Sequence, residues 1–119
     1  MPRDARVSLH DILDSTQYLL REAPVTTLKA FLRDKTAQLA VDRSLEIIGE
    51  AVTQLRRDHP GVYERFSAAS QITGLRNILV HAYWSVDHRE VWSILKTDIE
   101  PLRALVENLL NDPSLSGSP

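Results

Sequence analysis

Four polar residues with complementary chemistry occur within eight positions of this 119-residue sequence: Arg76, Asn77, His81 and Tyr83. An arginine guanidinium can hold a phosphate group with two hydrogen bonds. A histidine can give and take protons near pH 7, because its unperturbed pKa lies close to that value. An arginine and a histidine on one helix therefore form a minimal set of groups for cleavage of a phosphodiester bond.

The segment that must position these groups is predicted to be a helix over residues 70–83. At about 100° per residue its apolar side chains form one stripe: Ile72, Leu75, Ile78, Leu79 and Ala82. Asn77 and His81 stand one turn apart on the polar side. Arg76 and Tyr83 stand at the edge of the stripe. Spacing alone leaves another interpretation open, in which His81 bonds a carbonyl at the helix end and Tyr83 packs at the rim of the core.

The sequence pattern predicts helices in the rest of the chain as well. Apolar residues recur every three or four positions, only four glycines occur, and no alternating pattern supports a strand. Further helices are predicted over residues 4–22, around 28–32, over 35–58 and over 87–109. The sequence DHPG at 58–61 predicts a helix stop, followed by a loop to residue 69 with one turn at 62–66. Pro101 predicts a kink in the last helix without a break.

These elements predict an all-α fold, an antiparallel bundle of four to five helices. The length fits a single domain, residues 1–111. Residues 112–119 are expected to be a flexible tail, because they bury too little apolar surface to offset the entropy of ordering. Gly49 in the middle of a helix predicts the close approach of another helix.

The amino-acid composition excludes several classes of function. The chain has no cysteine, which excludes disulfides, zinc–thiolate sites and cysteine nucleophiles and favours the cytosol. The net charge of −2 lacks the broad positive field of a non-specific duplex-DNA binder. No apolar run approaches the roughly 18 residues of a membrane span, and the first residues are too charged for a signal peptide. We therefore expect a soluble, cytoplasmic protein with no membrane association.

Other charged residues have simpler interpretations. Arg56 and Arg57 stand near the end of the long helix, where positive charge compensates the helix dipole. His10, His59 and His88 lack the spacing of metal ligands and are expected at the surface. Glu46 and Glu50 could contact Arg76, although two carboxylates on a long helix usually form a solvated face.

The segment 72–87, ITGLRNILVHAYWSVD, resembles the R-x4-H-x-Y motif of the HepT-like branch of the HEPN ribonuclease toxins. Arg76, His81 and Tyr83 occupy the motif positions. LEIIGEAV at 45–52 is similar to the long-helix signature of the family, and VDHREVWSIL with the later IEPL resembles its last helix. The resemblance covers residues 7–110. One departure is Ala82, where the family commonly has glycine.

This resemblance implies a HEPN-like fold and a metal-independent endoribonuclease that needs no cofactor and acts as a homodimer. Arg76 and His81 of both subunits would then face RNA in a shared cleft, with Asn77 orienting the histidine or binding a phosphate oxygen. It also implies a toxin–antitoxin system whose minimal nucleotidyltransferase antitoxin adenylylates Tyr83. A non-catalytic dimerisation or partner-binding module of the same fold is the alternative, and a DNA-binding helix-turn-helix lacks a basic recognition helix.

Overall fold

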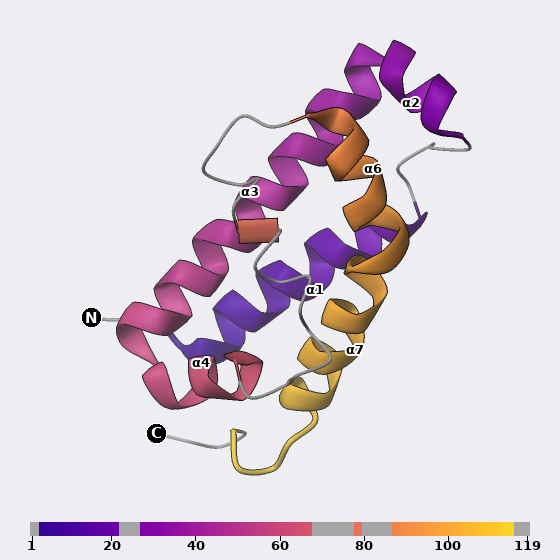
Figure 1. Ribbon diagram of the computed structural model, residues 1–119. Coiled ribbons are helices and arrows are strands. Elements are labelled where there is room, and N and C mark those ends of the chain that lie inside the picture. Colours follow the sequence, from indigo (N-terminus) through magenta and orange to yellow (C-terminus); the bar gives the residue numbers. More distant parts are fainter. Residues whose placement is uncertain (1–2, 22–26, 68–77, 80–86, 116–119) are drawn as a thin grey trace.

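A computed structural model of the chain describes residues 3–21, 27–67, 78–79 and 87–115, and all regular structure in these residues is helical (Figure 1). The helices are α1 (Ala5–Arg21), α2 (Leu28–Arg33), α3 (Lys35–Asp58), α4 (Pro60–Ser67), α6 (His88–Thr97) and α7 (Ile99–Leu110). The all-α, HEPN-like bundle is thus confirmed. None of the helices in this part of the chain is long and apolar enough to cross a membrane.

Helix α1 packs against both α3 and α7, and these three helices enclose most of the core. The predicted apolar face of the long helix is confirmed, because its spine residues are all fully buried or nearly so: Val41, Leu45, Ile48, Val52 and Leu55. Burial of each such side chain contributes about 1.5–3 kcal/mol. Helix α6 packs on α2 and α7, at the end of α3 that is far from α4 (Figure 1).

The bounds of α3 match the predicted 35–58 because both ends have local signals. The Asp34 carboxylate accepts a hydrogen bond from the Ala37 N–H at 3.0 Å, which caps the N-terminus. At the other end the His59 N–H donates to the Leu55 carbonyl at 2.7 Å. The helix therefore begins and ends where the sequence indicates.

Helix α4 lies where a loop with a single turn was expected, and that expectation was wrong. Pro60 occupies the first helical position, where its missing N–H needs no partner and its fixed φ suits a helix. The Tyr63 N–H donates to the His59 carbonyl at 3.0 Å, and the Phe66 ring is buried in the core. The proline that ends α3 therefore also starts α4.

The last predicted helix is divided, which corrects the expectation of a kink without a break. Helix α6 ends at Thr97, Asp98 forms a turn, and α7 begins at Ile99. The Asp98 N–H still donates to the Ile94 carbonyl at 2.9 Å. Pro101 then falls in the first turn of α7, where an N–H has no partner within the helix. Most of the predicted helix over 70–83 lies outside the described residues, and the other four predicted helices become six through this division and the addition of α4.

The first residues of the predicted tail make contacts. The Asp112 carboxylate accepts hydrogen bonds from the Arg65 guanidinium and, at 2.9 Å, from the Ser114 N–H. These contacts, with the Ser114 N–H first, lower the pKa of Asp112 to about 2. Leu115 packs against the core. A flexible tail over 112–119 stays a prediction.

Candidate functional site

The residues predicted to do chemistry lie outside the described residues: Arg76, Asn77, His81 and Tyr83. Their arrangement, and the predicted helix over most of 70–83, stay predictions. The structure does describe two residues between Arg76 and His81, and both are helical. These two residues test the predicted register of the apolar stripe.

Ile78 and Leu79 both contribute to the core, as the predicted stripe requires. The Ile78 side chain is fully buried, and Leu79 is half-buried against the same cluster of apolar residues. A helix that buries these two positions continues a stripe through residues three or four positions away. The described part of the motif segment is therefore anchored to the bundle by its apolar side chains.

A cavity of about 180 Å³ opens beside Leu79. Its other walls come from α3 and α4: Val52, Thr53, Arg56 and Tyr63. Val52 and Arg56 are four residues apart, so they lie on the same face of α3. The Thr53 hydroxyl donates to the Gly49 carbonyl at 2.8 Å. The cavity thus combines apolar walls with a guanidinium, a phenol and a hydroxyl.

The two arginines at the end of α3 differ in their contacts, although both were expected only to compensate the helix dipole. Arg57 forms an ion pair with Asp58, with Nε 3.2 Å from Oδ1. Arg56 is exposed and lines the cavity, and it makes no hydrogen bond or ion pair with another described residue. Tyr63 was missed as a site residue because its segment was expected to be a loop. No sequence signal placed it beside Arg56.

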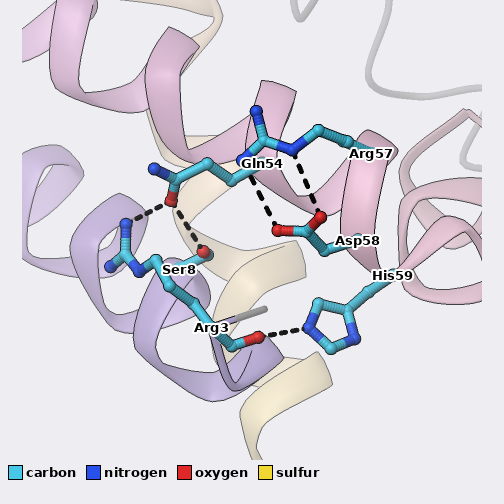
Figure 2. A network of polar contacts seen from close by, with 6 residues as sticks. All are labelled: Arg3, Ser8, Gln54, Arg57, Asp58 and His59. Carbon is cyan, nitrogen blue, oxygen red and sulfur yellow. Dashed lines mark hydrogen bonds and ion pairs between the residues drawn. The ribbon is translucent and has the colours of Figure 1, made fainter. Parts of the chain in front are cut away.

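The end of α3 that carries Arg56 is held to the N-terminal segment by a polar network (Figure 2). The Arg3 guanidinium donates to the Gln54 side-chain oxygen and to Asp11 at 2.6 Å. The Ser8 hydroxyl donates to the same Gln54 oxygen at 3.3 Å. The His59 ring donates from Nε2 to the Arg3 carbonyl. These contacts tie the corner between α3 and α4 to α1.

Two histidines expected to be plain surface residues have structural contacts, which corrects that expectation. His59 belongs to the network in Figure 2. His88 Nε2 lies 3.0 Å from Asp42 Oδ2, and its ring contacts Phe31 edge-on at 5.8 Å between centroids. This pair connects α6 to α3. The residues that make these contacts are 46 to 57 positions apart in sequence, so no local pattern could reveal them.

The long helix presents carboxylates on its exposed side, and its glycine is buried. Glu46 and Glu50 are exposed, and Glu50 forms an ion pair with Arg43 at 3.5 Å. Gly49 is buried, as close packing of another segment would require. Contact between these carboxylates and Arg76 stays a prediction, because Arg76 lies outside the described residues.

Comparison with known proteins identifies a family. Residues 12–109 match the model of the HepT-like family, described as ribonuclease HepT-like. A Methanocaldococcus jannaschii protein named "Putative RNase MJ1380" is 35% identical, over 88% of this chain and 95% of the relative. A Thermococcus cleftensis protein named "Probable ribonuclease HepT" is 34% identical, over 92% of this chain and 98% of the relative. No solved structure matches the chain.

Proposed function

Because the chain belongs to the HepT-like ribonuclease family, we propose that it is a metal-independent endoribonuclease with Arg76 and His81 as its catalytic residues. The observation that carries this proposal is the family match over residues 12–109, which includes both side chains and their motif spacing. The buried Ile78 and half-buried Leu79 between them support the register that leaves Asn77 and His81 on the polar side of the helix.

The chemistry needs only proton transfer and charge stabilisation, because RNA contains its own nucleophile. A base removes the proton of the 2′-hydroxyl, whose oxygen then forms a bond to phosphorus while the bond to the 5′-oxygen breaks. An acid donates a proton to the leaving 5′-oxygen. His81 serves in this proton transfer, and Arg76 holds the phosphate and stabilises its growing charge. Asn77 orients the imidazole or binds a phosphate oxygen. The products are a 2′,3′-cyclic phosphate and a 5′-hydroxyl.

The active form in this proposal is a homodimer. One chain supplies a single Arg76 and a single His81, whereas the reaction uses both a base and an acid. A two-fold axis close to the motif segments would bring two sets of these groups to one RNA strand. The protein would act in the cytoplasm as the toxin of a toxin–antitoxin system.

The ribonuclease activity is proposed to be inhibited by a covalent modification of the protein. A minimal nucleotidyltransferase antitoxin would transfer adenylate from ATP to the Tyr83 phenol, with release of pyrophosphate. The phosphate of the attached adenylate carries negative charge and would compete with RNA for Arg76. The modified toxin would therefore no longer cleave RNA.

The test is cleavage of RNA by the purified protein with and without a chelator. Arg76→Ala and His81→Ala should each abolish cleavage and growth inhibition, because each removes a group used in the transition state. Their circular dichroism and melting temperature should stay close to wild type, since neither residue belongs to the apolar stripe. Full activity of His81→Ala would contradict the assignment. An inactive wild type that still dimerises would favour the non-catalytic partner-binding module.

A further inference from the structure

We propose that the cavity lined by Arg56, Tyr63 and Leu79 binds one nucleotide of single-stranded RNA beside the cleavage site. Arg56 would contact the phosphate of this nucleotide, and the Tyr63 ring would stack on its base. This inference rests on the proposed function, since it extends the RNA path away from Arg76 and His81. Neither the family match nor the motif assigns these residues.

The composition of the cavity matches the chemistry of a nucleotide. A guanidinium binds phosphate oxygens through charge-assisted hydrogen bonds. A base stacks on an aromatic ring, and apolar side chains accept the remaining surface of the base. Arg56, Tyr63 and the apolar Val52 and Leu79 supply these three kinds of contact around one cavity. Its volume of about 180 Å³ equals about six water molecules at roughly 30 Å³ each, so it exceeds a packing defect.

The contacts of the two neighbouring arginines favour Arg56 as the ligand-binding one. Arg57 already forms an ion pair with the Asp58 carboxylate. Arg56 has no such partner among the described residues, and its position on the cavity wall leaves its guanidinium available to an anion. Compensation of the helix dipole explains a positive charge in the last turn, but it does not explain a cavity beside that charge.

The cavity also shares one wall with the predicted motif segment. Leu79 follows Arg76 by three positions, so on the predicted helix these two side chains are neighbours, while His81 stands on the polar side. The proposed path of the RNA strand therefore runs from Arg76 into this cavity. The opposite walls are held in place by the network that fixes the corner of α3 and α4 (Figure 2). A site on fixed helices loses little entropy when it binds its ligand.

Arginine substitutions give the first test, with Arg57 as the matched control. A short single-stranded RNA is titrated into His81→Ala protein, which cannot cleave it, and the dissociation constant is measured by fluorescence anisotropy. Adding Arg56→Gln should raise the dissociation constant about tenfold or more. It should also reduce the salt dependence of log K by about 0.7, the slope of one phosphate contact on a single strand. Arg57→Gln removes the same charge and should change affinity less than about twofold.

Tyrosine substitutions test stacking separately from charge. Tyr63→Phe keeps the ring and should preserve affinity, whereas Tyr63→Leu keeps apolar volume without the ring and should weaken binding about fivefold or more. Melting temperatures identify any loss of folding, and Tyr63→Phe retains the test if Tyr63→Leu unfolds. If Tyr63→Phe loses RNA affinity, the aromatic ring alone is not sufficient for RNA binding, and the proposed stacking role is wrong.

The outcomes separate this inference from the proposed function. A wild type that cleaves RNA, with Arg56→Gln and Arg57→Gln equal in RNA affinity, would overturn the nucleotide site alone. Failure of both wild type and His81→Ala to bind RNA would overturn the site and the nuclease together. If Arg56→Gln weakens binding of the nucleotidyltransferase and leaves RNA affinity unchanged, the cavity is a protein-docking site and the RNA assignment is wrong.

Discussion

The His88 imidazole lies 3.0 Å from the Asp42 carboxylate, and this pair connects α6 to the N-terminal half of α3 across 46 residues of sequence. Both side chains are only about 30% exposed, so solvent weakens their interaction less than it would weaken a surface pair. The same ring meets the edge of buried Phe31. His88 therefore joins three helices: α2, α3 and α6.

This pair predicts a measurable contribution to stability. His88→Ala should lower the free energy of unfolding by about 1–2 kcal/mol, because it removes a hydrogen bond to a carboxylate and an aromatic contact. Asp42→Ala should lower it by less, because the contact with Phe31 remains. Urea denaturation of both variants and of the double variant measures the coupling between the two side chains. Strictly additive effects would show that the contact contributes no stability.

Adenylylation predicts a change in mass and activity. Incubation of the wild type with the cognate nucleotidyltransferase and ATP should add one or more adenylate units and abolish RNA cleavage. Tyr83→Phe lacks the acceptor oxygen but keeps the ring, so it should fold normally and gain no adenylate at this position. Intact-mass spectrometry provides the readout. If active partner leaves the wild type unmodified, inhibition must come from binding alone.

Dimerisation predicts a mass in solution of twice the chain mass of 13.5 kDa. Light scattering at micromolar concentration measures this directly. Complementation adds a functional readout, since mixing Arg76→Ala with His81→Ala should restore part of the cleavage if the two subunits share one cleft. A monomer that cleaves RNA at full rate would contradict the shared site.

The Asp112 contacts predict a change in stability at acidic pH. The folded-state pKa of about 2 lies below the ordinary value of 3.8, so the stability from this carboxylate is present above about pH 4. It is lost as the pH falls from about 4 toward 2, where the folded protein takes up the proton. Asp112→Asn should therefore melt below the wild type at pH 6, and this difference should shrink toward pH 2. Thermal melts across this range measure it, and a constant difference would contradict the assignment. Arg65→Gln keeps the Ser114 N–H and should reproduce only part of the change.

Local sequence signals were enough to predict those features that depend on residues close together in the chain. The spacing of Val41, Leu45 and Ile48, with the stop signal at 58–61, predicted the extent of α3, because a helix depends on residues three or four positions apart. The same rule predicted that Ile78 would be buried. The motif containing Arg76 and His81 identified the family from residue types and spacing. Their mutual arrangement stays a prediction, because they lie outside the described residues.

Packing between residues far apart in the chain determined the features that the sequence analysis missed. Pro60 ended a helix in the sequence analysis, but burial of Phe66 against the bundle stabilises a further helix, α4, directly after it. That helix brings Tyr63 to the cavity wall beside Arg56. The contrast between Arg56 and Arg57, like the pairing of His88 with Asp42, depends on which side chains meet after the helices pack. Such contacts join residues far apart in the chain, and their geometry exists only in the folded protein.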